Sequence, residues 1–323
     1  MQKHQFTDFF DPKIQRIVNG DGCTVYKMKN ATGEGVITHY GIFPGIELFY
    51  NDFHMSDGEN RNKLPLPGVL EINHCREGRF ECVFENGDRQ YIGAGDLSVN
   101  RLTNQTVSTF FPMSHYHGVS ITIALDAAAG TIGALESVMG NLHIDLAGIA
   151  ERFCSRDICY VLRGRDAVAH IFHELYQAPP EMAAHYLKVK VLELLMYLND
   201  TPAADYPKER RYFSKNQVQT VRQMEAYMKE HLSRHDTLKE LSARFDIPMT
   251  TMKTCFKSVY GCSIYAYMKS YRMQAAMLLL RDTADSITEI AAKMGYDNPS
   301  KFSETFKKEF GQLPSDFRKS LSK

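Results

Sequence analysis

Two stretches of the sequence decide the fold of its C-terminal half. Residues 238–261 read LKELSARFDIPMTTMKTCFKSVYG, and residues 287–311 read ITEIAAKMGYDNPSKFSETFKKEFG. Their first halves match at an offset of 49 residues and their second halves at an offset of 50, so the second copy is one residue longer at its centre. Apolar residues that recur every three or four positions in both copies predict two pairs of short helices.

Each copy has the anatomy of a helix-turn-helix. Small residues, Ser242 and Ala291, stand where two steeply crossed helices must touch. Four residues later, Asp246 and Gly295 tolerate the left-handed backbone that a sharp turn commonly uses. The predicted capping residues are Thr237 and Ser286 at the helix starts and Gly261 and Gly311 at the helix ends. An ordinary helical bundle is the alternative, but two such units at a near-constant offset favour paired helix-turn-helix units.

The net charge of the chain is zero, with 38 Lys and Arg residues against 38 Asp and Glu. The two halves differ, because residues 1–207 hold 17 basic and 25 acidic side chains, a net of −8, whereas residues 208–323 hold 21 and 13, a net of +8. Residues 201–214 include two prolines and polar turn formers and predict a linker. A basic half beside an acidic one indicates one domain that attracts polyanions such as nucleic acid and one that does not.

The second copy and its continuation, Gly295–Arg318, read GYDNPSKFSETFKKEFGQLPSDFR. This run resembles the signature of AraC-type (AraC/XylS) bacterial transcription regulators, and the resemblance covers about a third of the chain. It implies a DNA-binding domain at 215–323 with two helix-turn-helix units, which a central helix at about 263–280 joins. The expected buried stripe of that central helix comprises Ile264, Tyr267, Met268, Tyr271, Ala275 and Leu278.

In that family the second helix of each unit lies in the major groove of double-stranded DNA. Helical spacing predicts that Met252, Cys255 and Phe256 pack inward in the first unit and Phe302, Thr305 and Phe306 in the second. The positions left to face DNA are Thr250, Thr251, Lys253, Thr254, Lys257, Ser300, Lys301, Ser303, Glu304 and Lys307. Lysine neutralises phosphate, threonine can contact phosphate or a thymine methyl group, and glutamate can accept from cytosine N4. Many relatives carry arginine where this chain has Thr254 and Glu304, so guanine readout is not expected there.

Short apolar runs broken by glycine and proline fill residues 24–125 and predict an antiparallel barrel or jelly roll. The runs 71–81 and 93–97 are similar to the cupin-like barrel of AraC-type sensor domains. The expected fold class is thus α+β, with a cupin-like barrel at 1–130, a helical dimerisation region at 131–200, and the linker and DNA-binding domain after it. A barrel interior can hold one small molecule. By strand alternation the expected effector contacts are Phe49, His54, Asn73, Phe111 and Tyr116.

An apolar stripe about three turns long marks the helix before the linker. Its members are Leu187, Val191, Leu194, Leu195 and Leu198. The resemblance implies that this helix forms a homodimer. Packing of the helix against its own barrel is the alternative.

A cupin-type metalloenzyme with an accessory DNA-binding domain is the alternative function, because cupins often bind metals. Such a metal site requires two histidines one residue apart and a following glutamate. At the expected place this chain has His74-Cys75-Arg76 instead. His115 and His117 have the right spacing but lack the glutamate partner. No motif of the common catalytic sites stands out. We therefore expect no enzymatic activity, no bound metal and no cofactor.

The sequence thus predicts a sequence-specific transcription regulator, more specifically an activator, which a small-molecule effector controls. RNA polymerase is an expected partner beside double-stranded promoter DNA. The chain has no apolar run of the ~20 residues that a membrane span needs, and its first residues do not resemble a signal peptide. Seven cysteines without a CxxC pair indicate free thiols, so a cytoplasmic location is expected.

Overall fold

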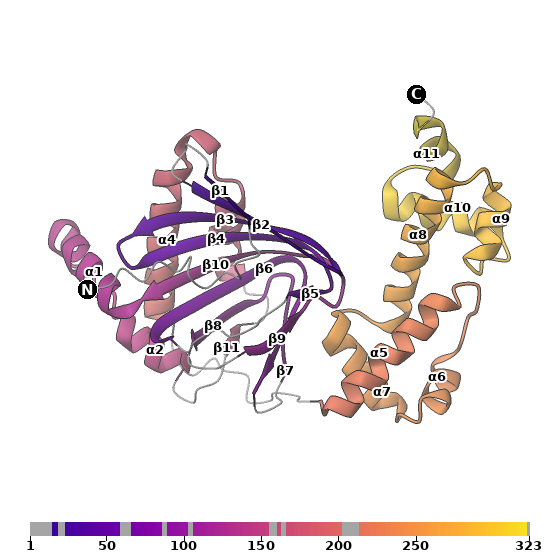
Figure 1. Ribbon diagram of the computed structural model, residues 1–323, viewed down its shortest axis with the longest axis horizontal. Helices are drawn as coiled ribbons and strands as arrows, with labels where there is room; N and C mark the ends of the chain where they lie inside the picture. Colours follow the sequence, from indigo (N-terminus) through magenta and orange to yellow (C-terminus); the bar gives the residue numbers. More distant parts are fainter. Residues whose placement is uncertain are drawn as a thin grey trace. The chain divides into compact units, whose positions relative to one another are not determined.

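The computed structural model describes residues 15–18, 23–58, 66–85, 89–102, 106–154, 160–162, 166–201 and 213–321. The chain forms two compact units, Met1–Tyr212 (unit 1) and Phe213–Lys323 (unit 2), and each is described by itself (Figure 1). The division between the units falls inside the predicted linker at 201–214, most of which lies outside the described residues. Unit 1 combines strands and helices and unit 2 is helical, so the predicted α+β class is confirmed.

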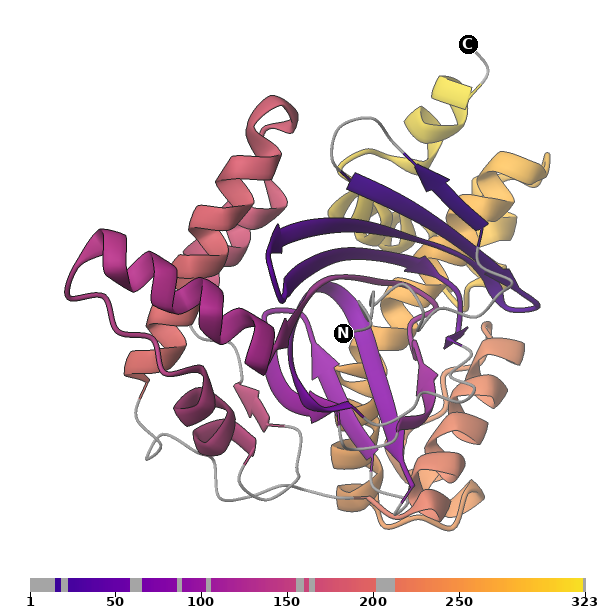
Figure 2. The ribbon, with the colours of Figure 1, turned by 60° about the vertical axis from the view of Figure 1, so that its left-hand side comes forward.

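Unit 1 is built on an antiparallel sheet that curls into a half-barrel (Figures 1 and 2). Its strands are β1 (Gln15–Val18), β2 (Cys23–Asn30), β3 (Gly33–Phe43), β4 (Ile46–His54), β5 (Asp57–Gly58), β6 (Leu66–Phe84), β7 (Arg89–Gly93), β8 (Leu97–Leu102), β9 (Thr106–Phe110), β10 (Tyr116–Ala124) and β11 (Tyr160–Leu162). The main path runs in the order β1, β2, β3, β4, β10, β6, β8 and β11. The first part of β6 pairs with β8 and β10 and its last part with β7 and β9, so this long strand carries the sheet around the bend.

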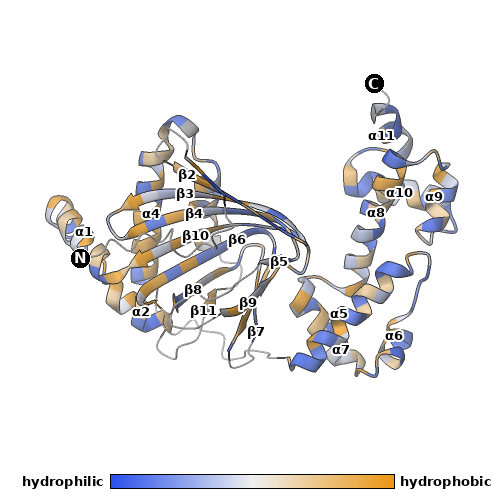
Figure 3. Ribbon diagram, viewed as in Figure 1, coloured by the Kyte–Doolittle hydropathy of each residue, from blue (hydrophilic) through white to orange (hydrophobic). Residues whose placement is uncertain are grey.

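Side chains alternate between the two faces of this sheet, and each face has its own apolar cluster. The interior of the half-barrel gathers Tyr26, Ile37, Phe49, Phe53, Met55, Cys75, Ile92, Phe111 and Tyr116. The outer face carries residues such as Leu48, Leu70 and Val119, which share a core with the helices. Figure 3 shows hydrophobic residues both on the strands of the half-barrel and on the helices beside it.

Helices cover the outer face of the half-barrel (Figure 2). They are α1 (Leu125–Met139), α2 (Leu146–Cys154), α3 (Asp166–Tyr176), the 3-10 helix η2 (Pro180–Met182) and α4 (Ala183–Asp200). Tyr50 of β4 donates a hydrogen bond of 2.6 Å to the Leu175 carbonyl of α3. His74 of β6 stacks on Phe172, with ring centroids 3.8 Å apart. The sheet and the helices are therefore joined by polar as well as apolar contacts.

The predicted dimer stripe of α4 is part of the core of unit 1. All five of its side chains are buried there: Leu187, Val191, Leu194, Leu195 and Leu198. The prediction that these side chains form a dimer contact is wrong, because α2, α3 and β3 pack against the helix and already cover them. The alternative, a helix packed on its own barrel, describes α4.

Unit 2 consists, over the part that the structure describes, of seven helices. They are α5 (Lys215–Glu230), α6 (Leu238–Arg244), α7 (Met249–Tyr260), α8 (Ile264–Asp282), α9 (Ile287–Lys293), α10 (Pro299–Phe310) and α11 (Pro314–Leu321). α8 is the predicted central helix, and it lies between the α6–α7 pair and the α9–α10 pair (Figure 1). Over the described ranges of both units, no helix is long and apolar enough to cross a membrane.

Candidate DNA-binding surface and effector site

The first helix-turn-helix is fixed by its cap and its turn. The Thr237 hydroxyl accepts a hydrogen bond from the Glu240 amide, and the Glu240 carboxylate accepts one from the Thr237 amide. Asp246 adopts the left-handed φ of 47° in the turn, and Ser242 donates to the Ile247 carbonyl over 2.6 Å. The predicted cap and turn are confirmed. Ser242 is therefore more than a small residue at a helix crossing, because its hydroxyl also closes the turn.

The second helix-turn-helix repeats this construction with a different turn residue. Ser286 and Glu289 form the same reciprocal cap at the start of α9. Gly295 has a φ of 78°, and a Cβ placed on it would lie 2.8 Å from both the Ser233 carbonyl oxygen and Nε2 of His235. Glycine is therefore required at this turn both for the backbone angle and for the space.

The second helix of each unit, α7 and α10, has one buried face and one outward face. The side chains of the predicted inward face are fully buried at Met252, Cys255, Phe256, Phe302 and Phe306. Thr305 differs, since it is only half-buried and donates its hydroxyl to the Lys301 carbonyl. Both helices end at a glycine in the left-handed conformation, as predicted, at Gly261 and Gly311.

The predicted DNA-facing residues gather on the outward faces of α7 and α10. None of them is buried: Thr250, Thr251, Lys253, Thr254, Lys257, Ser300, Lys301, Ser303, Glu304 and Lys307. Local hydrogen bonds determine which hydrogen-bonding groups two of these residues can present to DNA. Thr254 donates its hydroxyl to the Thr250 carbonyl over 2.8 Å, and Ser303 donates to the Pro299 carbonyl over 2.9 Å. In this arrangement both hydroxyls keep lone pairs, which can accept from the amino groups of adenine or cytosine.

The two outward helices begin differently. In α10 the side-chain oxygen of Asn298 accepts from the amides of Ser300 and Lys301, and Pro299 follows at the first helical position. α7 begins after Pro248 with no side-chain cap, so the positive end of this helix can receive a DNA phosphate. The Asn298 cap was not among the predicted caps, although asparagine before proline is a sequence signal for a helix start.

Comparison with known proteins agrees with this geometry. A family model described as a helix-turn-helix domain matches residues 241–320. The chain is 29% identical over 144 residues to the HTH-type transcriptional regulator ExsA of Pseudomonas aeruginosa, covering 45% of this chain and 50% of that protein. It is 25% identical over 154 residues to the HTH-type transcriptional activator RhaS of Klebsiella pneumoniae, covering 47% and 53%. The chain thus spans about half the length of these curated relatives.

A solved structure is similar to the same part of the chain. It is that of a probable AraC family transcriptional regulator from Rhodopseudomonas palustris, to which the chain is 30% identical, covering 32% of this chain and 97% of that one with a TM-score of 0.29. The C-terminal unit belongs to the AraC family. The predicted family is therefore confirmed for the C-terminal unit, which carries the two helix-turn-helix units.

In the AraC-type domain, hydrogen bonds join the connection between α5 and α6 to the central helix and to the second helix-turn-helix. Arg272 of α8 is buried, and its guanidinium donates to the carbonyls of Leu232 and Arg234 in the connection after α5. Nε2 of His235, in the same connection, lies 2.7 Å from the Gly295 carbonyl oxygen in the turn of the second unit. This connection, which leads into α6, therefore links α8 with the turn of the second unit.

The buried face of α8 in the AraC-type domain follows the prediction only at its start. Ile264, Tyr267 and Met268 are buried, as expected. Leu278 is instead 45% exposed, and Tyr271 and Ala275 are half-buried. Further along the helix the buried apolar positions are Met273, Ala276 and Leu280. The helix packs against α5 and α7 near its start and against α9, α10 and α11 further on, so its buried face moves around the helix axis.

In unit 1, the interior of the half-barrel receives four of the five predicted effector contacts. Phe49, Phe111 and Tyr116 belong to the interior apolar cluster. Asn73 lies on the same face, since it stands opposite Ser120, which itself stands opposite Phe49. The Ser120 hydroxyl donates to the Asn73 side-chain oxygen over 2.6 Å. The interior therefore has both aromatic and polar side chains.

His54 does not line this interior. It lies on the outer face of β4, where its Nε2 is 3.0 Å from a carboxylate oxygen of Asp52, and Phe53 takes the neighbouring interior position. The prediction of His54 as an effector contact is wrong, because successive residues of a strand point to opposite faces and the register was not known from the sequence.

A polar pair that the sequence did not single out lies beside Phe49. His39 stacks on Phe49 with ring centroids 4.8 Å apart, and its Nε2 is 3.6 Å from Oε2 of Glu47. That distance is too long for a hydrogen bond. Neither of these two atoms has a hydrogen-bond partner among the described residues. Burial raises the pKa of Glu47 to about 7 and lowers the pKa of His39. These two buried side-chain atoms, Nε2 of His39 and Oε2 of Glu47, lack a hydrogen bond within the described ranges and so form a place where a polar group of a ligand can bind.

Proposed function

We propose that this chain is a transcription regulator that binds double-stranded promoter DNA through α7 and α10. The observation that carries the proposal is the pair of helix-turn-helix units, each of which has an outward polar face on its second helix. One relative is named a transcriptional activator, which supports activation as the sign of regulation. An activator would contact RNA polymerase beside its DNA site. The names of the relatives are those of regulators, so we propose no enzymatic activity.

Within this proposal the outward side chains divide by their chemistry. The lysines, Lys253, Lys257, Lys301 and Lys307, would neutralise phosphates and set the affinity. The hydroxyl residues would contact base edges or phosphates, and Glu304 would accept from a cytosine amino group. Glu304 would also repel phosphate, so it favours one placement of α10 in the groove over others.

A gel-shift titration tests the DNA surface. The DNA is a sequence that the wild-type chain enriches from a random pool. We expect Lys253→Glu with Lys301→Glu to lower the affinity by about a hundredfold or more and to reduce the slope of log K against log salt by about 2, since two phosphate contacts are lost. The control is Lys27→Glu with Lys29→Glu, which makes the same charge change at exposed positions of β2.

Two outcomes would contradict this assignment. Wild-type affinity and salt slope in the Lys253/Lys301 variant would mean that α7 and α10 do not face DNA. Equal weakening by the Lys27/Lys29 control would mean that the net charge of the chain, and not contact by these helices, governs binding.

We further propose that a small-molecule effector binds inside the half-barrel and controls DNA binding. The combination of an aromatic cluster with the His39–Glu47 pair supports an effector that has a flat apolar part and a polar group. Near neutral pH the Glu47 carboxyl can donate as well as accept a hydrogen bond, because burial holds its pKa at about 7.

We propose a homodimer as well, but through a different face of α4 from the one that the sequence indicated. Val189 is 62% exposed and Met196 is 43% exposed, although both are apolar. They are seven residues apart and therefore share one side of the helix, and Met182, the last residue of η2, lies seven residues before Val189. Such a row is typical of a helix that pairs with a second copy.

A further inference from the structure

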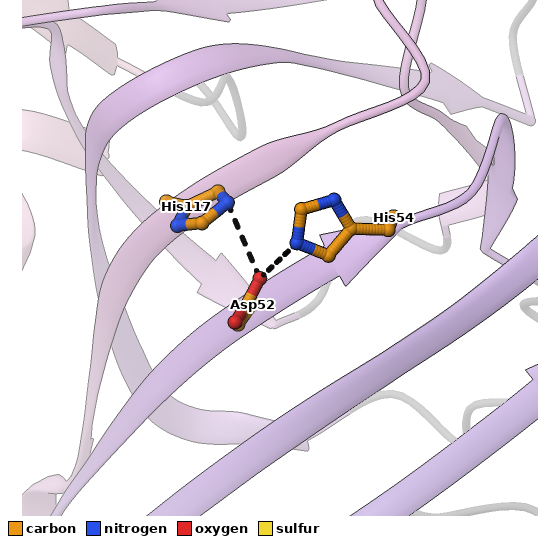
Figure 4. Close-up of side chains that lie close together, drawn as sticks. All are labelled: Asp52, His54 and His117. Carbon is orange, nitrogen blue, oxygen red and sulfur yellow. Dashed lines mark ion pairs between the residues drawn. The ribbon is translucent and has the colours of Figure 1, made fainter. Parts of the chain in front are cut away.

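Three metal-ligating side chains converge on the outer face of the half-barrel. One carboxylate oxygen of Asp52 lies 3.0 Å from Nε2 of His54 and 3.2 Å from Nε2 of His117, and the two rings point at that oxygen from either side (Figure 4). All three ligand atoms lie within 4.8 Å of one another. We propose that this cluster binds a divalent transition-metal ion of the Zn²⁺ type.

The register of two strands brings the three residues together. Asp52 and His54 are two residues apart on β4, so they share a face. His117 stands directly opposite Asp52 on β10. Their face is the outer one, because Leu48 of the same alternation packs against the helices whereas Phe49 and Phe53 point inside. The cluster is therefore separated by the sheet from the His39–Glu47 pair, and the proposal does not depend on an effector inside the half-barrel.

The donor set selects the class of metal. Two imidazole nitrogens with one carboxylate oxygen suit Zn²⁺, Co²⁺, Ni²⁺ or Cu²⁺, whereas Mg²⁺ and Ca²⁺ prefer oxygen donors alone. A zinc ion about 2.0–2.2 Å from each donor holds tetrahedral donor atoms about 3.3 Å apart. The two distances from Asp52, 3.0 and 3.2 Å, already match that spacing. Only the distance between the two imidazole nitrogens has to shorten for all three donors to reach one ion.

Carboxylates for a fourth position stand next to the cluster. Glu34 of β3 lies opposite His54, and Glu77 of β6 lies opposite His117. Residues opposite each other in an antiparallel pair have Cβ atoms about 4.5–5.5 Å apart, so a change of rotamer can bring either carboxylate to the ion. Both glutamates are exposed. They also make the surroundings of the two histidines negative, which favours a cation.

An ion pair without metal is the competing explanation of the same geometry. It needs a protonated histidine, and it contributes little at exposed positions, since screened pairs are worth about 0–1 kcal/mol. The side chains of Asp52 and His54 are 51% and 61% exposed. Convergence of two rings on one oxygen therefore has little stabilising value in the absence of a cation.

Metal titration of the full chain tests the site. The protein is stripped with a chelator, dialysed and titrated with Zn²⁺ by calorimetry and with Co²⁺ by visible spectroscopy. We expect one Zn²⁺ per chain in the wild type and a Co²⁺ spectrum without a thiolate charge-transfer band. The double variant His54→Gln with His117→Gln should weaken Zn²⁺ binding by about a hundredfold or more, since two of three protein ligands are lost. Asp52→Asn should weaken it as well.

The matched control removes two exposed histidines elsewhere, His143→Gln with His173→Gln. It should bind Zn²⁺ as the wild type does. Thermal unfolding without metal should be the same for all chains, which separates loss of ligands from loss of the fold. The proposal is overturned if the wild type binds no Zn²⁺, if the His54/His117 and Asp52 variants bind it as tightly as the wild type, or if the Co²⁺ spectrum shows thiolate ligation.

Discussion

Two glycines with nearly the same backbone angle have different surroundings. Gly295, in the turn of the second helix-turn-helix, has a φ of 78°, and Gly311, at the end of α10, has a φ of 76°. A Cβ at Gly295 would meet Ser233 and His235 at 2.8 Å, whereas a Cβ at Gly311 would meet no atom within 4 Å. Gly311 is thus needed only for its backbone angle, and Gly295 also for the close approach of the preceding connection.

Alanine at these two glycines separates the two effects. Gly311→Ala should lower the free energy of unfolding by about 1 kcal/mol, the cost of a left-handed angle in a residue with a Cβ. Gly295→Ala should cost about 3 kcal/mol, because a backbone carbonyl and the His235 ring must also move. Urea unfolding of the two variants measures both values. Equal costs would show that the connection after α5 does not pack on the turn as described.

A second prediction at this scale concerns His74, which lies between the sheet and α3. Its ring stacks on Phe172, its Nδ1 is 3.0 Å from the Tyr176 hydroxyl, and burial lowers its pKa to about 4. An unfolded histidine titrates at about 6.5, so the unfolded chain takes up the proton first as the pH falls. The contribution of His74 to stability is therefore complete above pH 6.5 and is lost toward pH 4, by about 2 kcal/mol at pH 5.

Unfolding of His74→Gln at pH 7 and pH 5 measures this loss. The variant should be less stable at pH 7, where it lacks the stacked ring, and its stability should change less between the two pH values than that of the wild type. His173→Gln, at an exposed position of α3, is the control and should keep the wild-type difference. A His74→Gln chain that loses as much stability at pH 5 as the wild type would assign the pH dependence to other groups.

At the scale of helices and strands, the sequence was informative where the signal is local. The caps at Thr237 and Ser286 act within one turn of helix, so their residue types alone indicate them. The stripe of α4 was ambiguous, because burial leaves the same pattern whether the covering surface is the helix's own barrel or a second copy. His54 and His117 were not assigned to one site, because only the pairing of β4 with β10 brings them together.

The outer face of α4 gives a prediction at this scale. Val189→Glu with Met196→Glu should convert a dimer into a monomer in sedimentation velocity runs, because charges would replace the apolar row. Val138→Glu with Met139→Glu is the matched control, since it changes two exposed apolar residues at the end of α1. A dimer that survives the first double variant, or a wild-type chain that is already monomeric, would contradict this interface.

For the whole molecule, the charge divides as the fold does. Unit 1 holds 20 basic and 26 acidic residues, a net of −6, and unit 2 holds 18 and 12, a net of +6. The attraction to DNA is thus confined to the AraC-type domain, while unit 1 is repelled by phosphates.

An effector should reveal itself through the stability of the full chain. A compound at a hundred times its dissociation constant stabilises the folded state by about 3 kcal/mol, so a screen of metabolite classes by thermal shift can find it. Glu47→Gln should reduce the shift, because the proposed polar contact changes. Glu151→Gln, at an exposed position of α2, should leave the shift unaltered. A compound that stabilises both variants like the wild type binds outside the half-barrel interior.

The central helix of the AraC-type domain has a consequence for the DNA that this chain can read. α8 has 19 residues and is about 28 Å long, somewhat less than the roughly 34 Å of one turn of B-form DNA. Arg272 and His235 link the connection before α6 to α8 and to the turn of the second unit, so these bonds oppose changes in the distance between α7 and α10. If α7 and α10 both enter the major groove as proposed, a binding site should keep its two half-sites in helical phase, and an inserted half-turn of DNA should leave one recognition helix facing the wrong side of the duplex.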